Sequence, residues 1–225
     1  TIPLLHEAHQ AGKKILFEGA QGAMLDIDFG TYPYETSSNP SSGGVAIGSG
    51  IGVTHIDAVL GIVKAYTTRV GEGPFPTELK NALGDRIREA GHEYGTTTHR
   101  PRRIGWFDGV VLRYSAMING MTGVALMLLD VLTGVDELKI CTHYLLDGKE
   151  IYHIPARLED YERCIPVYRT YPGWDSNITT VKSFKDLPVE AKNYIKAIEE
   201  ICSIRVQCFS VGPDREQTIL RSSMF

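Results

Sequence analysis

The sequence predicts an α/β fold in which helices flank a mostly parallel central sheet. Short continuous apolar runs alternate along the chain with segments of helical periodicity, which is the order that βα units produce. A β-hairpin pattern and a long amphipathic segment near the C-terminal end fit the same fold class. The 225 residues contain no internal repeat and no low-complexity linker, so we expect one domain spanning residues 1–225.

The first part of the chain predicts one strand, one helix and two loops. An apolar run at residues 15–17 meets a glycine-rich turn at 18–22, which is typical of a buried strand that ends where a ligand can approach the backbone. The polar stretch 31–52 is longer than ordinary loops, and such loops are usually functional or disordered. Apolar spacing over 54–67 predicts a helix, whereas glycine and proline make 68–76 a loop.

The middle of the chain predicts two helices and a strand. Residues 81–90 and 110–121 have helical spacing, and a polar loop at 91–103 separates them. The apolar run 124–129 predicts a buried strand that Asp130 ends.

The last part of the chain predicts a hairpin, a helix and a final strand. Residues 139–154 alternate around an Asp-Gly turn, which indicates a β-hairpin. Residues 187–201 form the clearest amphipathic helix, opened by Pro188. The run 206–209 predicts a buried strand that leads into Ser210.

Composition excludes several classes of protein. With 23 basic and 27 acidic side chains the net charge is −4, so we expect no nucleic-acid or membrane-surface partner. A hydrophobic content of 43% excludes a disordered chain. No run approaches the roughly 18 apolar residues of a membrane-spanning helix. The four cysteines and seven histidines form no metal-ligand pattern, and we expect the cysteines to be buried free thiols in a reducing cytoplasm.

The strongest functional signal is an arginine-rich loop. It reads Thr96, Thr97, Thr98, His99, Arg100, Pro101, Arg102, with a third arginine directly after it. Guanidinium groups bind carboxylate or phosphate through paired hydrogen bonds, and hydroxyls add directional contacts. The loop therefore predicts an anion site, with a solvated basic turn as the alternative.

Polar side chains at the ends of predicted strands form a second signal. Ligands of open α/β sheets bind outside the carboxyl ends of the strands, where Asp130, Ser210 and Gly212 lie. A carboxylate there can accept from two donors of a guanine edge, although an aspartate that merely turns the chain is the alternative. Gln21 and Thr36 carry amide and hydroxyl groups suited to a heteroaromatic ring or a phosphate.

Eight stretches of the chain, in order, resemble one known family. They are residues 15–22, 25–34, 36–39, 64–71, 105–108, 129–132, 171–174 and 210–215. The family is adenylosuccinate synthetase, and the resemblance implies the C-terminal part of its P-loop-GTPase-like fold. It also implies a ligase of purine biosynthesis that joins IMP and L-aspartate at the expense of GTP, with Mg²⁺ as cofactor. IMP is first phosphorylated on its 6-oxygen, and the aspartate amine then displaces the phosphate.

The resemblance assigns a role to each candidate residue. It implies IMP contacts at Gln21, Thr36, Val70 and Arg100. It implies an aspartate-binding loop formed by Thr96, Thr97, Thr98, His99, Arg100, Pro101 and Arg102. It implies GTP contacts at Arg102, Asp130, Ser210 and Gly212. A cytoplasmic homodimer is also implied.

Two positions depart from the family, and some of its motifs do not occur in this chain. The family usually has glycine where His99 stands and lysine where Leu128 stands, so we expect weaker loop closure and a weaker guanine pocket. The family's phosphate loop, its acid–base pair and its magnesium ligands belong to its first half. We therefore expect no catalytic and no metal-binding residue here, and an inactive isolated chain. A purine-nucleotide binding fragment and a purely structural domain are the alternatives.

Overall fold

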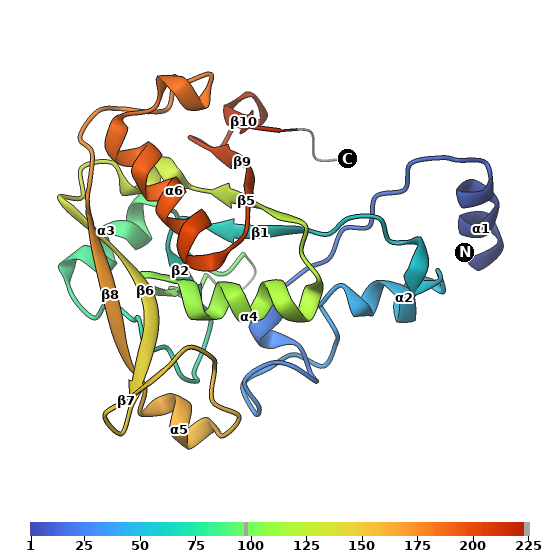
Figure 1. Ribbon diagram of the computed structural model, residues 1–225, viewed down its shortest axis with the longest axis horizontal. Coiled ribbons are helices and arrows are strands. Elements are labelled where there is room, and N and C mark those ends of the chain that lie inside the picture. Colours follow the sequence, from blue (N-terminus) through green and yellow to red (C-terminus); the bar gives the residue numbers. More distant parts are fainter. Residues whose placement is uncertain (97–98, 223–225) are drawn as a thin grey trace.

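A parallel sheet extended by one antiparallel strand lies at the centre of the computed structural model, which describes residues 1–96 and 99–222 (Figure 1). The strand order is β1 (Leu60–Lys64), β5 (Gly123–Met127), β9 (Val206–Ser210) and β10 (Thr218–Leu220). β1, β5 and β9 run parallel, and β10 is antiparallel to β9. The predicted strands that became β5 and β9 are confirmed.

A second sheet has β6 (Glu137–Leu146) at its centre. β4 (Phe107–Asp108) pairs parallel with β6, while β7 (Lys149–Ile151) and β8 (Ile165–Pro172) pair antiparallel with it. β2 (Thr67–Arg69) and β3 (Arg103–Gly105) form a separate antiparallel pair. The predicted hairpin is confirmed as β6 and β7, and the mixed pairing of the second sheet adds antiparallel strands to the predicted parallel architecture.

The helices in the described residues are α1 (Ile2–Gln10), α2 (Gly43–Ser49), α3 (Ala82–Ala90), α4 (Gly109–Asn119), α5 (Leu158–Glu162) and α6 (Val189–Cys202). Of these, α3, α4 and α6 pack against strands, whereas α1 and α2 lie apart from the sheets (Figure 1). Single 3₁₀ turns are η1 (Ala23–Leu25), η2 (Val53–His55), η3 (Leu129–Leu132), η4 (Phe184–Asp186) and η5 (Arg215–Gln217). The predictions that correspond to α3, α4 and α6 are confirmed. α3 begins where the Asn81 side chain accepts from the backbone of Gly84, which is how a helix N-cap satisfies a free N–H.

The main core lies between the central sheet, α6 and the second sheet. Leu126 of β5, Ile198 of α6 and Ile140 of β6 are all completely buried in it. All four cysteines are buried free thiols, as predicted. Among the residues that the structure describes, no helix combines the length and hydropathy needed to cross a membrane.

The helix predicted at 54–67 and the strand predicted at 15–17 are wrong, and the long loop predicted over 31–52 contains α2. Apart from the 3₁₀ turn η2, residues 54–67 form no helix, because Leu60 to Lys64 instead pair residue by residue with β5. Pairing in a sheet overrides a local apolar spacing that fits a helix equally well. Residues 15–17 form no strand, and Leu16 is 80% exposed. A strand needs a neighbour for its backbone N–H and C=O groups, and the described part of the chain provides none here.

Candidate functional site

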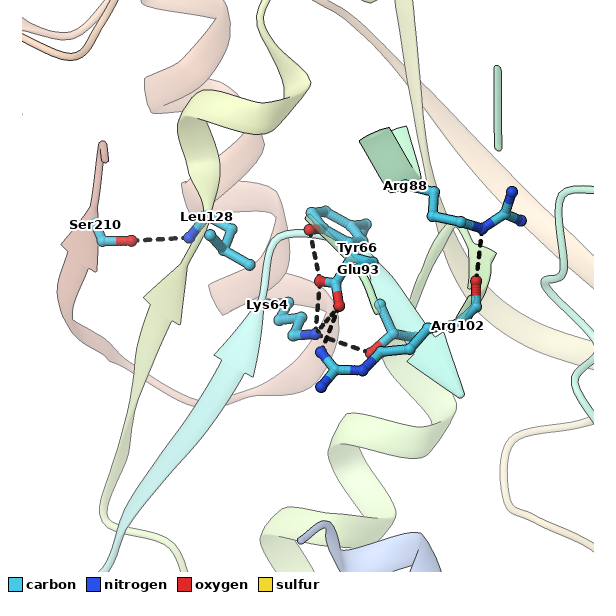
Figure 2. Close-up of polar contacts among 8 residues, drawn as sticks. Lys64, Tyr66, Arg88, Glu93, Arg102, Leu128 and Ser210 are labelled. Carbon is cyan, nitrogen blue, oxygen red and sulfur yellow. Dashed lines mark hydrogen bonds and ion pairs between the residues drawn. The ribbon is translucent and has the colours of Figure 1, made fainter. Parts of the chain in front are cut away.

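The parallel strands bring three segments distant in sequence to one edge of the central sheet. Because β1, β5 and β9 run the same way, their carboxyl ends lie at the same edge. Tyr66 follows β1, Asp130 follows β5, and Ser210 is the last residue of β9. The Leu128 N–H donates to the Ser210 hydroxyl at 2.8 Å, which ties the ends of β5 and β9 together (Figure 2).

Asp130 is the polar group at this edge whose bonding is incomplete. It is half-buried in η3, and its Oδ1 atom is buried without a hydrogen-bond partner among the described residues. Burial raises the pKa of this carboxyl. Buried acceptors are almost always paired in folded proteins, so an unpaired one marks a place where a ligand can supply the donor.

Gly212 lies in the turn after β9, where the backbone packs closely. A Cβ atom at this position would collide with the side chain of Gln217. The backbone N–H of Val211 donates to the Gln217 carbonyl at 3.0 Å, and the Gln217 amide donates to the Thr179 carbonyl at 3.0 Å. Ser210 and Gly212 therefore shape the turn beside Asp130.

Beside this edge lies a charged cluster centred on Glu93, whose carboxylate is almost completely enclosed (Figure 2). Lys64 Nζ donates to both carboxylate oxygens at 2.6 and 2.7 Å, and Arg102 Nη1 donates to Oε2 at 2.6 Å. The Tyr66 hydroxyl donates to Oε1 at 2.7 Å. Lys64 also donates to the Thr68 hydroxyl at 3.0 Å. We call Lys64, Tyr66, Glu93 and Arg102 the Glu93 cluster.

Electrostatics connect the Glu93 cluster to Asp130. Burial raises the pKa of the Tyr66 phenol, and the negative charges of Glu93 and Asp130 raise it further, while Arg102 opposes them. The charges of Asp130 and Arg102 thus both influence the pKa of this phenol.

The arginine-rich loop stands on a short stem. The backbone N–H of Arg102 donates to the Glu93 carbonyl, and that of Gly95 donates to the Arg100 carbonyl, each at 2.9 Å. Tyr94 and Pro101 form an isolated antiparallel β-bridge. The tip residues Thr96, His99 and Arg100 are exposed. His99 has φ of +50°, the left-handed conformation that a glycine adopts at no cost. Thr97 and Thr98 lie outside the described residues.

Two of the four candidate IMP residues, Gln21 and Thr36, lie together on the segment before β1. Gln21 Oε1 accepts from the Ser38 hydroxyl at 3.3 Å, and that hydroxyl lies 3.2 Å from the Thr36 hydroxyl. The structure therefore brings Gln21 and Thr36 together through Ser38. Val70 is 50% exposed and follows Arg69 at the end of β2.

Three members of the Glu93 cluster were not predicted as site residues from the sequence: Lys64, Tyr66 and Glu93. Lys64 and Glu93 are 29 positions apart, and no spacing motif relates them. Lys64 stood in a segment predicted as a helix and Glu93 in one predicted as a loop. In the described part of the chain, no group of three or more His, Cys, Asp or Glu side chains could hold a metal ion.

Comparisons with known proteins show the family to which this chain belongs. A model of the adenylosuccinate synthetase family matches residues 1–219. The chain is 60% identical over 218 residues to an adenylosuccinate synthetase of Ligilactobacillus salivarius, covering 97% of this chain and 51% of that protein. It is 56% identical over 225 residues to the enzyme of Streptococcus gordonii, covering 100% of this chain and 52% of that protein.

The structure also matches solved structures. A fully ligated adenylosuccinate synthetase from Plasmodium falciparum superposes with a TM-score of 0.95 at 44% identity, over 98% of this chain and 53% of that chain. A cyanophage succinoaminodeoxyadenylate synthetase, at 18% identity and a TM-score of 0.58, shares the fold. The chain spans about half the length of the curated relatives it matches. With the family model covering nearly all of it, this chain belongs to the adenylosuccinate synthetase family.

Proposed function

We propose that this chain is the C-terminal part of an adenylosuccinate synthetase, and that the complete enzyme joins IMP and L-aspartate at the expense of GTP. The observation that supports this most directly is the unpaired, buried Oδ1 of Asp130 at the carboxyl end of β5. A guanine edge offers two adjacent N–H donors to such a carboxylate, and adenine does not. Ser210 and Gly212 would complete the base pocket.

Charge and positioning are what this chain would contribute to the reaction. Phosphoryl transfer depends on neutralising phosphate charge and on alignment more than on covalent help from the protein. Arg102 would bind GTP. The loop Thr96–Arg102, with Arg100 at its tip, would hold the aspartate carboxylates. Gln21, Thr36, Val70 and Arg100 would orient IMP so that its 6-oxygen and the amine of aspartate meet in the right order.

The remaining expectations are part of the same proposal. Mg²⁺ is the expected cofactor, and its ligands are expected in the first half of the complete enzyme. The acid–base pair is likewise expected from another part of the complete enzyme. We also propose a homodimer in the cytoplasm, as the family resemblance implies.

Calorimetric titration of the 225-residue chain with GDP, ADP and IMP tests the binding part of the proposal. We expect heat with GDP and with IMP and a much weaker response to ADP, because adenine lacks the donors that Asp130 requires. No heat with GDP or IMP would favour a purely structural domain.

An assay for adenylosuccinate formation tests the catalytic part. The complete protein should turn over IMP, GTP and aspartate, and the isolated chain should not. Turnover by the isolated chain would contradict the assignment of the acid–base pair to another part. Binding without turnover by the complete protein would favour the second candidate, a nucleotide-binding protein without catalysis.

A further inference from the structure

Glu93 carries a buried negative charge that none of the substrate contacts proposed above uses. Its side chain is 1% exposed, and its two oxygens accept four hydrogen bonds from Lys64, Tyr66 and Arg102. Burial opposes ionisation, but the bonds and charge of Lys64, with donors from Tyr66 and Arg102, outweigh burial and lower the pKa of Glu93. The carboxylate is therefore charged at neutral pH.

The charges of the Glu93 cluster do not cancel. One carboxylate is shared by two cations, the ammonium of Lys64 and the guanidinium of Arg102. Both cations remain partly exposed, with 28% and 27% of their side chains accessible. Within the Glu93 cluster one positive charge is left over, and it favours an incoming carboxylate or phosphate. Asp130 lies outside the cluster and adds a negative charge where η3 follows β5.

Glu93 also holds the base of the arginine-rich loop through its backbone. Its carbonyl accepts from the Arg102 N–H at 2.9 Å, and the Arg102 carbonyl accepts from Arg88 Nε at 2.8 Å (Figure 2). Arg102 is thus fastened at its backbone N–H, its carbonyl and one nitrogen of its guanidinium. Its guanidinium direction is set before any ligand arrives, which is the preorganisation that anion recognition benefits from.

A neighbouring ion pair shows what a simpler arrangement looks like. Glu78 binds Arg103, the residue after Arg102, through two bonds of 2.7 Å each. That pair joins one carboxylate to one guanidinium at β3, and Lys80 approaches it from the surface at 3.5 Å. Glu93, in contrast, connects the loop stem to Lys64 and Tyr66 at the carboxyl end of β1.

We propose that Glu93 is a positioning residue for the anion-binding loop: its carboxylate fixes Arg102 and Lys64 at the sheet edge so that their surplus positive charge faces the carboxylate of aspartate or the phosphates of GTP. This inference rests on the proposed function, because that function supplies the anions. Aspartate and GTP both present negatively charged oxygens to such a site. Separate measurements of the KM for aspartate and the KM for GTP show which of the two the cluster binds.

The test is Glu93→Gln in the complete protein, with steady-state kinetics for each substrate. If Glu93 positions the cations, KM for aspartate or for GTP rises about tenfold or more, because a charge-assisted network is broken. The KM for IMP stays within about twofold of the wild-type value. The fall in kcat is smaller than the rise in the KM for aspartate or GTP. If Glu93 only neutralises charge, its removal strengthens anion binding and both KM values fall, which overturns the proposal.

Glu78→Gln is the matched control, since it breaks a similar ion pair one residue away. We expect it to lower the melting temperature comparably and to leave all three KM values unchanged. Identical kinetic behaviour of the two variants would reduce Glu93 to a structural residue. Tyr66→Phe removes one donor to Glu93 without changing the ring, and we expect the same KM to rise severalfold. This variant decides the question if Glu93→Gln does not fold.

These outcomes separate the inference from the function on which it rests. If the wild-type complete protein forms no adenylosuccinate, the proposed function is wrong. If it forms the product and Glu93→Gln has wild-type KM values, only the inference about Glu93 is wrong.

Discussion

Replacing Asp130 by alanine should make the chain more stable, although it should damage the proposed nucleotide site. The carboxylate has one oxygen buried without a donor among the described residues. A buried polar atom without a partner costs about 1–3 kcal/mol, and removing the atom recovers that cost. Because Asp130 is only half-buried, and because a carboxylate in the first turn of η3 gains something from the helix dipole, we expect a net gain of about 1 kcal/mol.

The gain in the free energy of unfolding on Asp130→Ala should be larger at neutral pH than at acidic pH. Burial raises the pKa of Asp130 above its ordinary value of 3.8. A carboxyl with a raised pKa in the folded state stabilises the fold at low pH, and that contribution is lost as pH rises through the folded pKa. The advantage of Asp130→Ala should therefore be largest at neutral pH and should shrink as the wild-type carboxyl becomes protonated.

Thermal unfolding of the 225-residue chain at neutral and at acidic pH measures this effect. For a chain of this length a gain of about 1 kcal/mol raises Tm by roughly 2–4 °C. Asp26→Ala is the control: Asp26 is fully buried, but its carboxylate accepts from the backbone of Asp28, Phe29 and Ser41, so its loss must lower Tm. An unchanged or lower Tm for Asp130→Ala at neutral pH would mean that this carboxylate is satisfied in the folded chain.

Two further predictions concern the loop and the core. Arg100→Ala in the complete protein should raise the aspartate KM or lower turnover by an amount equivalent to about 1.5–3 kcal/mol. Unchanged kinetics in this variant would mean that the loop does not bind aspartate through Arg100. Asp108→Asn should flatten the pH dependence of the free energy of unfolding, measured by urea denaturation. Burial raises the pKa of Asp108 from 3.8 to about 6. The free energy of unfolding of the wild type therefore falls by up to about 3 kcal/mol as pH rises through this interval. Asparagine can still cap α4 by accepting from Val110 and Val111, and an equal pH slope in both proteins would contradict the assignment.

The sequence predicted correctly the elements that depend only on residues close together in the chain. The hairpin of β6 and β7 turns at Asp147 and Gly148, whose φ values of +51° and +78° suit the Asp-Gly pair that predicted it. α6 follows from an apolar stripe and from Pro188 at its N-cap. These signals need no partner elsewhere in the chain.

The two failures have a common cause, which is pairing between distant segments. The apolar spacing of β1 fits a helix when read alone, and only its pairing with β5 makes it a strand. Residues 15–17 have the apolar character of a strand but lack a neighbouring strand in the described part of the chain. Periodicity predicts which face of a segment is apolar. It does not predict which distant segment pairs with or packs against that face.

The candidate site shows the same division. Asp130 and Ser210 could be predicted because they follow apolar runs, and the ends of parallel strands share one edge. Arg100 and Arg102 could be predicted from their charge density. Glu93 could not, because its importance comes from three donors that the fold gathers around it.

The central claim is that the carboxyl edge of the β1–β5–β9 sheet recognises a guanine base through Asp130. Measuring kcat/KM of the complete protein with GTP and with ATP, for the wild type and for Asp130→Asn, tests it most directly. An asparagine can present an N–H group to the guanine edge in place of an acceptor, so we expect the preference for GTP to fall by about tenfold or more. An unchanged ratio of GTP to ATP activity would contradict the claim.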